Sequence, residues 1–89
     1  MRLVFQHQAW EDVTWFATHD RAVFKRLTRV IDDALRDPFV GIGKPERLVG
    51  DLTGWWSRRI TDEHRLVYRV ESSDDSGELL VVAQARYHY

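Results

Sequence analysis

Residues 55–71 carry the sequence WWSRRITDEHRLVYRVE, in which apolar and polar side chains alternate on both sides of a short polar turn. The alternation predicts one strand over Trp55–Ile60 and a second over His64–Glu71. Only Thr61, Asp62 and Glu63 connect them, and a connection this short requires antiparallel pairing. We therefore expect an antiparallel hairpin in this half of the chain.

Further strands are expected on both sides of this hairpin. The segment Glu46–Val49 precedes it, separated from it by the turn Gly50–Gly54. The segment Glu78–Tyr87 follows it after the polar loop Ser72–Gly77, and Arg2–Gln6 reads as a short opening strand. Because the connections between consecutive strands are short, we expect a mostly antiparallel sheet.

Two helices are predicted after the opening strand. Apolar residues recur with helical spacing over Gln8–Thr18, Asp20 is a suitable N-cap for a second helix, and Pro38 ends that helix. The apolar stripe of the second helix comprises Val23, Leu27, Val30, Ile31 and Ala34. The expected fold is therefore α+β, with two N-terminal helices packed on one face of a twisted, mostly antiparallel sheet. We expect it to form a single domain over residues 1–89.

The composition excludes several classes of protein. The 89 residues are 44% hydrophobic and 30% charged, with a formal net charge of −1 and no cysteine. Disulfides and thiolate-bound zinc are therefore absent. No apolar run is long enough to cross a membrane, and the start is too short for a signal peptide, so we expect a cytoplasmic protein without a membrane partner. Arginines greatly outnumber lysines, which favours planar contacts to phosphate, although a GC-rich genome also produces this bias.

Alternation along the strands divides their side chains between two faces. We expect the core face to carry Trp56 and Ile60, then Leu66, Tyr68 and Val70, and in the last strand the odd-numbered set Leu79, Val81, Ala83, Ala85 and Tyr87. The open face then receives Trp55, Ser57, Arg59, Arg65, Arg69, Gln84, Arg86 and His88. So many cations on one face indicate a local anion site, although a solvated sheet face is the simpler alternative.

The residue types on this face suit metal-free cleavage of RNA. If the RNA's own 2′-hydroxyl attacks the adjacent phosphate, the reaction needs a base, cations near the phosphoryl oxygens and an acid for the leaving oxygen. Glu46, Arg65 and His88 are one such set, although spacing alone does not show that they meet. No metal-ligand spacing is present, so we expect neither a metal nor another cofactor.

The chain resembles the YoeB family of ribosome-dependent toxins, within the wider RelE-like ribonucleases, over essentially its whole length. The matching positions are Trp10, Asp12, Pro38-Phe39, Gly41, Gly43-Lys44-Pro45-Glu46, Leu52, Gly54, Trp56 to Thr61, Glu63 to Tyr68 and Ala85 to Tyr89. The resemblance implies the toxin of a type II toxin–antitoxin system, an endoribonuclease that cuts mRNA in the ribosomal A site and so inhibits translation. The implied products are a 2′,3′-cyclic phosphate and a 5′-hydroxyl.

The resemblance also implies roles for individual residues. Glu46 is the expected general base, Arg65 stabilises the transition state, and His88 is the general acid. In supporting roles, Lys44 and Arg59 hold phosphate and Tyr89 orients the substrate. Trp55, Arg69 and Arg86 are further candidates, and Trp55 could stack on a base or cover a dimer contact.

The implied partners are a YefM-like antitoxin, the ribosome with its mRNA, and a second copy of the chain in a homodimer. Operator DNA would be reached only through the antitoxin. The alternative function is a binding module, which blocks the A site without cutting or acts as an antitoxin-bound co-repressor. Two departures leave room for it: Val49 stands where the family's type member has a basic residue, and the loop Ser72–Gly77 is longer and acidic, as expected of a solvated hairpin tip.

Overall fold

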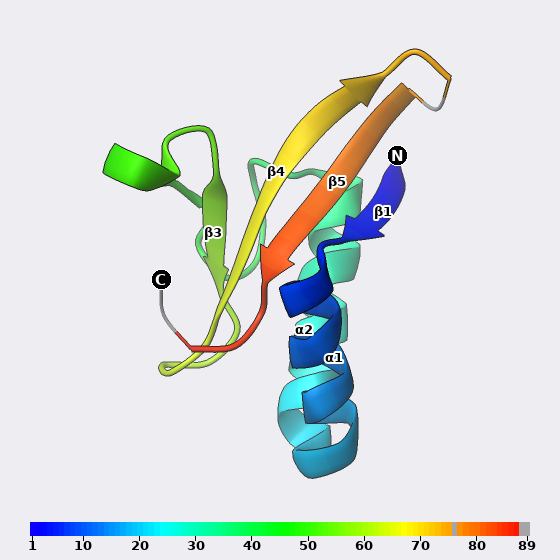
Figure 1. Ribbon diagram of the computed structural model, residues 1–89. Helices are drawn as coiled ribbons and strands as arrows, with labels where there is room; N and C mark the ends of the chain where they lie inside the picture. Colours follow the sequence, from blue (N-terminus) through cyan, green and yellow to red (C-terminus); the bar gives the residue numbers. More distant parts are fainter. Residues whose placement is uncertain (76, 88–89) are drawn as a thin grey trace.

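The computed structural model describes residues 1–75 and 77–87, so His88 and Tyr89 lie outside the described residues. Its elements, in chain order, are β1 (Arg2–Phe5), α1 (His7–His19), α2 (Arg21–Arg36), β2 (Glu46–Arg47), a 3₁₀ turn (Gly50–Leu52), β3 (Trp56–Arg59), β4 (Arg65–Ser73) and β5 (Gly77–Gln84). Figure 1 shows the two helices as an antiparallel hairpin beside a twisted sheet. The predicted order and type of the elements are confirmed, although β2 and β5 are shorter than expected.

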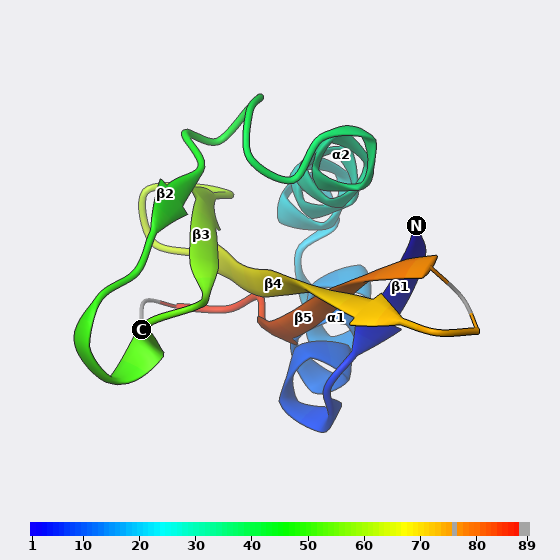
Figure 2. The ribbon, with the colours of Figure 1, turned by 90° about the horizontal axis from the view of Figure 1, so that it is seen from above.

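The strands form a mixed five-stranded sheet in the order β1-β5-β4-β3-β2. The neighbours within β2–β5 are antiparallel, whereas β1 pairs in parallel with β5. The parallel pair joins the beginning of the chain to the middle of its last strand. Seen from above in Figure 2, β2 and β3 lie at the side of the sheet farthest from β1. The expectation of a mostly antiparallel sheet is therefore confirmed.

The helices close one face of the sheet around a core. As predicted, Asp20 caps α2, and its carboxylate accepts a hydrogen bond of 3.2 Å from the Val23 amide. The buried cluster includes Phe16 from α1, then Leu27, Val30, Ile31 and Ala34 from α2, Leu66 and Tyr68 from β4, and Leu80 and Val82 from β5. The apolar stripe of α2 therefore faces the sheet, as its helical spacing indicated.

A β-bulge corrects the predicted faces of the last strand. Tyr68 pairs with Val82, but the preceding residue Val67 pairs with Gln84, so Ala83 is an extra residue in β5. Before the bulge the core set is the even-numbered one, with Leu80 and Val82 buried in the core, and the odd-numbered prediction was wrong there. Because the extra residue reverses the alternation, Gln84 still reaches the open face.

The last strand ends earlier than predicted because a side chain takes over its hydrogen bonding. The Ala85 amide donates to Asp12 Oδ2 at 2.9 Å instead of continuing the ladder. Asp12 is 5% exposed on α1, and its other carboxylate oxygen, Oδ1, accepts from the side-chain Nε2 of Gln8 at 2.8 Å. After Gln84 the chain therefore leaves the β5 ladder and passes from α1 to the β3–β4 turn.

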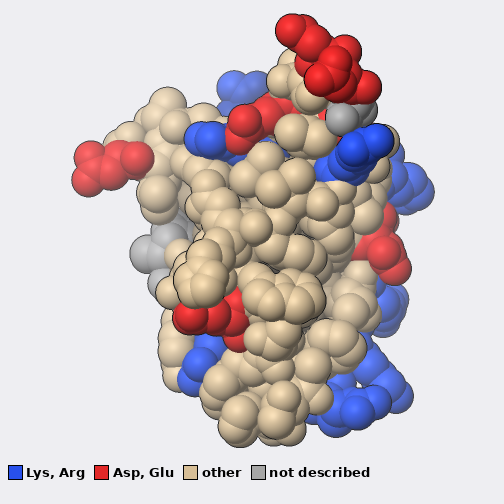
Figure 3. Space-filling view, turned by 45° about the vertical axis from the view of Figure 1, so that its right-hand side comes forward, with Lys and Arg blue, Asp and Glu red and all other residues tan. Residues whose placement is uncertain are grey.

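Charge is unevenly distributed over the surface. Figure 3, which brings the β1 side forward, shows mostly uncharged side chains over the centre of this face and both basic and acidic side chains around its rim. Asp74 and Asp75 are exposed at the tip of the β4–β5 hairpin, as expected of a solvated tip. A net charge of −1 therefore conceals local surfaces of different character. Among the described residues, no helix has the length and apolar character needed to cross a bilayer.

Candidate active site

Strand register places Glu46 and two arginines on the face of the sheet that points away from the helices. Glu46 of β2 lies opposite Ser57 of β3, and Arg59 of β3 lies opposite Arg65 of β4. Glu46 and Arg65 are therefore two strands apart and offset by two residues, which puts their Cα atoms about 12 Å apart. Side chains as long as Glu and Arg can reach a common phosphodiester group across that distance.

The loop before β2 brings Lys44 to Glu46. The Lys44 Nζ atom lies 3.5 Å from Glu46 Oε1, and the two side chains are 80% and 53% exposed. The loop is fastened to β3, because the Arg59 amide donates to the Gly43 carbonyl at 2.6 Å. Gly43 has a φ of 79°, and a Cβ atom there would lie 2.7 Å from the Arg59 carbonyl oxygen. This close approach requires glycine and sets the position of the Lys44–Glu46 pair.

The Arg65 guanidinium is held against the β3–β4 turn. One of its terminal nitrogens, Nη1, donates to the carbonyl oxygens of Thr61, Asp62 and His64 at 2.6, 3.2 and 3.1 Å. The neighbouring Arg59 is 54% exposed and lies 3.7 Å from the Asp62 carboxylate. The turn therefore positions one arginine by its backbone and the other by a weak surface ion pair.

The end of the described chain returns to Arg65. The Arg65 amide donates to the Tyr87 carbonyl at 3.1 Å. The predicted acid His88 and the supporting residue Tyr89 lie outside the described residues, so their predicted roles stay predictions. The residue that precedes His88 in the sequence is nevertheless held beside one of the candidate site residues.

Arg69 and Trp55 lie on the predicted face but contact each other. The Arg69 guanidinium is 4.4 Å from the centroid of the Trp55 ring, and its Nε atom is 2.7 Å from Glu71 Oε2. The positive charge of Arg69 is therefore already compensated. These contacts hold the Trp55 ring, the Arg69 guanidinium and the Glu71 carboxylate together.

The predicted orientation of Arg86 was wrong. Its guanidinium lies 3.6 Å from the centroid of the Trp15 ring on α1, so the side chain packs toward the helices. The physical reason is that β5 ends at Gln84, and strand alternation no longer applies to Arg86. One terminal nitrogen donates to the Tyr87 hydroxyl at 2.9 Å.

A buried arginine that sequence analysis did not select supports the site from behind. Arg58 is fully buried, with Nη1 2.6 Å from Asp33 Oδ2 and Nε 3.0 Å from the Tyr68 hydroxyl. Its terminal nitrogens also donate to the carbonyl oxygens of Asp37, Val40 and Ile42, and thus hold the loop that leads to Glu46. The sequence did contain a signal for this residue: Arg58 alternates with Trp56 and Ile60, so the strand pattern places its charged side chain on the core face.

This network shifts the pKa values of Asp33 and Tyr68. Hydrogen bonds from Arg36, Arg58 and the Ile42 amide hold the pKa of the Asp33 carboxyl well below its usual range. Burial raises the pKa of the Tyr68 hydroxyl, which donates to the Pro38 carbonyl at 2.6 Å. A Cβ atom on Gly41 would lie 1.9 Å from Asp33 Oδ2, so only glycine permits the loop to pass this carboxylate.

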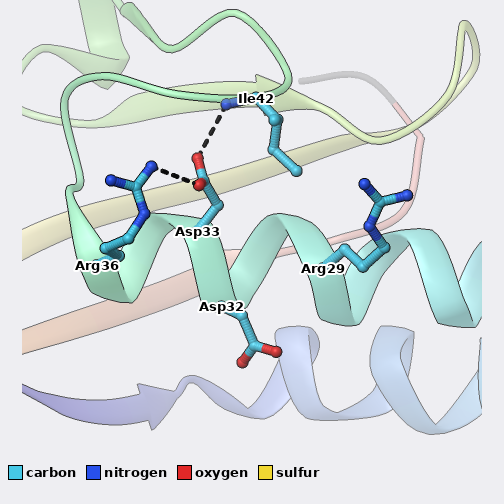
Figure 4. A pocket seen from close by; sticks show the side chains of 5 residues that line it. All are labelled: Arg29, Asp32, Asp33, Arg36 and Ile42. Atoms are coloured by element: carbon cyan, nitrogen blue, oxygen red, sulfur yellow. Dashed lines mark hydrogen bonds and ion pairs between the residues drawn. The ribbon is translucent and has the colours of Figure 1, made fainter.

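Two depressions lie outside the Glu46–Arg65 face. One of about 330 Å³ is lined by Arg29, Asp32, Asp33, Arg36 and Ile42. Figure 4 shows that the Asp33 carboxylate in it already accepts hydrogen bonds from Arg36 and from the Ile42 amide. The other, of about 280 Å³, is lined by Arg47, Leu48, Thr53, Gly54, Trp55 and Trp56. Within residues 1–75 and 77–87, no group of three or more histidine or carboxylate side chains is arranged to hold a metal ion.

Residues 5–89 match the model of the YoeB-like toxin of bacterial type II toxin–antitoxin systems. The chain belongs to this family. It is 56% identical over 89 residues to Toxin YoeB of Streptomyces coelicolor, with complete coverage of both chains. The protein is therefore a toxin of a type II toxin–antitoxin system.

Solved structures agree with this assignment. The YoeB/ParE toxin from Agrobacterium tumefaciens superposes with a TM-score of 0.93 at 46% identity, and all of both chains is covered. The Staphylococcus aureus YoeB dimer gives a TM-score of 0.86 at 38% identity, covering 100% of this chain and 98% of that one. A chain of a heterotetrameric YoeB–YefM complex from Staphylococcus aureus gives a TM-score of 0.84 at 39% identity, with the same coverage. The fold of this toxin is therefore that of the YoeB family.

Proposed function

We propose that this toxin is an endoribonuclease that cuts mRNA in the ribosomal A site without a metal ion. The observation that carries the proposal is the register that gathers Glu46, Arg59 and Arg65 on one open sheet face, with Lys44 beside Glu46. A carboxylate that can accept a proton next to several cations is suited to a phosphodiester whose own hydroxyl is the nucleophile.

The first half of the reaction uses the described residues. The Glu46 carboxylate takes the proton from the 2′-hydroxyl, and the 2′-oxygen then forms a bond to the adjacent phosphorus. Negative charge increases on the phosphoryl oxygens as this bond forms. Arg65 stabilises that charge, while Arg59 and Lys44 hold the phosphate in place.

The second half breaks the bond between phosphorus and the 5′-oxygen. His88 donates its proton to the leaving oxygen, and Tyr89 orients the substrate. An imidazole has an ordinary pKa near 6.5, so a histidine can hold and release a proton at cellular pH. The products are a 2′,3′-cyclic phosphate and a 5′-hydroxyl, after which Glu46 and His88 exchange protons with water to return to their starting states.

The partners follow from the relatives. The S. aureus toxin forms a dimer and a complex with YefM, and we propose a homodimer and a YefM-like antitoxin for this chain. An antitoxin tail that folds on the toxin would cover or distort the open face. The proposed substrate places the toxin in the cytoplasm, and operator DNA would be bound through the antitoxin.

A message with one altered sugar tests the reaction. Ribosomes are programmed with mRNA that carries a single 2′-deoxynucleotide on the 5′ side of the cleaved bond, and cleavage is mapped by primer extension. We expect cleavage of the all-ribose message and loss of cleavage at the altered bond, because the nucleophile is missing. The 5′ fragment of the all-ribose message should end in a 2′,3′-cyclic phosphate.

Two results would contradict the proposal. Equal cleavage of the deoxy-substituted bond would show that another nucleophile attacks the phosphorus. Inhibition of translation with intact all-ribose message would instead support the alternative function, in which the toxin blocks the A site without cutting.

A further inference from the structure

His64 occupies a position that an apolar residue could fill by volume alone. Its side chain is buried in the turn before β4, with the residue 9% exposed. The imidazole packs edge-on to Phe16 with 4.9 Å between centroids, and it lies 5.4 Å from the Tyr87 ring. Because burying a polar ring costs free energy unless it is hydrogen-bonded, the reason for a histidine here lies in its nitrogen atoms.

The Nδ1 atom of His64 holds the backbone of the C-terminal segment. The Tyr87 amide nitrogen lies 2.8 Å from His64 Nδ1. A backbone amide only donates hydrogen bonds, so Nδ1 must be the acceptor and carry no proton. His64 is therefore a neutral imidazole with its proton on Nε2, in one defined tautomer.

Arg65, the residue after His64, forms a second hydrogen bond to the Tyr87 backbone. The Arg65 amide donates to the Tyr87 carbonyl at 3.1 Å, so consecutive residues at the start of β4 bind both backbone polar groups of Tyr87. Tyr87 has a φ of 63°, a left-handed conformation that is unfavourable for a residue with a side chain. The two hydrogen bonds stabilise that conformation and fasten the Tyr87 backbone to the start of β4.

We infer that His64 is a positioning residue for catalysis, which holds the backbone of Tyr87, the residue before the proposed acid His88, beside Arg65. The inference rests on the proposed function for the role of His88. His64 itself touches no reacting atom, and its effect on cleavage is exerted through the Tyr87 backbone. A displacement of about 1 Å of a catalytic group can reduce a rate about 100-fold, so a single hydrogen bond of this kind can matter.

Two substitutions separate the hydrogen bond from the volume of the ring. His64→Asn places an acceptor oxygen as many bonds from Cα as Nδ1, so it can still accept from the Tyr87 amide. His64→Phe keeps the ring and its packing on Phe16 but removes the acceptor. His19→Phe is the matched control, because His19 is an exposed histidine that stacks on Trp15 at 4.5 Å.

Cleavage on programmed ribosomes should follow the acceptor. We expect His64→Phe to lower kcat about 100-fold with an unchanged KM for ribosomes, and His64→Asn to stay within about threefold of the wild type. His19→Phe should cleave at the wild-type rate. Wild-type kcat in His64→Phe, or an equal loss in the Asn and Phe variants, would overturn the inference.

Nitrogen-15 NMR of the wild-type toxin, compared with folded His64→Phe, tests the hydrogen bond directly. We expect His64 ring signals of the Nε2–H tautomer and slow hydrogen exchange of the Tyr87 amide, with exchange accelerated in folded His64→Phe. A proton on Nδ1, or a Tyr87 amide that exchanges at the rate of an open chain, would overturn the inference even if a variant failed to fold. Failure of the wild type to cleave would refute the proposed function instead, while the tautomer and the exchange rate would still be decided.

Discussion

Arg59 and Arg65 face each other directly across β3 and β4. Like charges in this cross-strand position destabilise a sheet by up to about 1 kcal/mol. Glu46, two residues away along β3 and one strand farther out, is already paired with Lys44. The pair of arginines is therefore more easily explained by an anion bound over them than by the stability of the sheet.

Replacing the proposed base should reduce the chemical step. We expect Glu46→Gln to lower kcat at least about 100-fold, because the amide has almost the shape of the carboxylate but does not accept the 2′-hydroxyl proton. The measurement is single-turnover cleavage on programmed ribosomes. Glu71→Gln is the matched control, since Glu71 is six residues, or about 20 Å, along β4 from Arg65. Wild-type kcat in Glu46→Gln would refute its role as the base.

Asp33 should make the toxin less stable in acid. Its pKa in the folded state is lowered, so it stabilises the fold fully above the ordinary aspartate pKa of about 3.9. That contribution is lost as the pH falls below this value toward the folded-state pKa. We expect the free energy of unfolding, measured in urea, to fall as the pH is lowered from about 5 to about 2.

Asp33→Asn isolates this effect from the other carboxylates. The amide does not titrate, so the variant should be less stable than the wild type at neutral pH and lose less of its remaining stability in acid. If the wild type and Asp33→Asn lost equal stability between about pH 5 and about pH 2, the assignment of this pH dependence to Asp33 would be wrong.

The loop between α2 and β2 is ordered by β3 rather than by its own sequence. Arg58 of β3 donates to the carbonyl oxygens of Asp37, Val40 and Ile42, and it also binds Asp33 of α2. Three elements therefore meet at one buried guanidinium. The position of Glu46 depends on this junction, since the loop leads directly into β2.

Removing this junction should destabilise the whole fold. We expect Arg58→Met to lower the free energy of unfolding by about 3–5 kcal/mol, because buried carbonyl oxygens and Asp33 lose their donor. Urea unfolding followed by tryptophan fluorescence measures the loss. Arg59→Met is the matched control: its side chain is 54% exposed and weakly paired, so its loss should be under about 1 kcal/mol. Equal losses in the two variants would show that the buried network is not stabilising.

At the scale of the whole molecule, Ala85 and Arg86, which follow β5, both contact the first helix. Asp12 of α1 binds the Ala85 amide, and Arg86 lies on Trp15 of the same helix. Residues 85–87, which follow β5, are thus held between α1 and the β3–β4 turn. A partner that covers the open face would contact the sheet and the C-terminal segment together.

Binding of the proposed antitoxin should therefore stabilise the toxin. With free antitoxin at 100 times its Kd, the gain is about 2.7 kcal/mol. That gain raises the Tm of a domain of this size by about 10–20 °C. Calorimetry of the purified toxin with its antitoxin measures the shift, and an antitoxin with a scrambled C-terminal tail is the control. An unchanged Tm, or an equal shift with the scrambled tail, would contradict a partner that folds on the toxin.

The sequence by itself determined the local features of this toxin. The Asp20 cap, the apolar stripe of α2, the β3–β4 turn and the open-face position of Arg59 and Arg65 were all predictable, because each depends on neighbours within a few residues along the chain. Glu46 was selected for the chemistry of its carboxylate and because the chain resembles a known family there. The pairing of β2 with β3 then put it on the same face as Arg59 and Arg65.

Only the tertiary structure decided what depends on contacts between distant segments. The bulge at Ala83 reversed the faces of β5, Asp12 ended that strand, and Trp15 drew Arg86 toward the helices. Arg58 is buried because a carboxylate from α2 and carbonyl oxygens from the loop converge on it, and no local pattern specifies such partners. Periodicity describes an undisturbed strand, and these hydrogen bonds and stacking contacts across the fold are what disturb it.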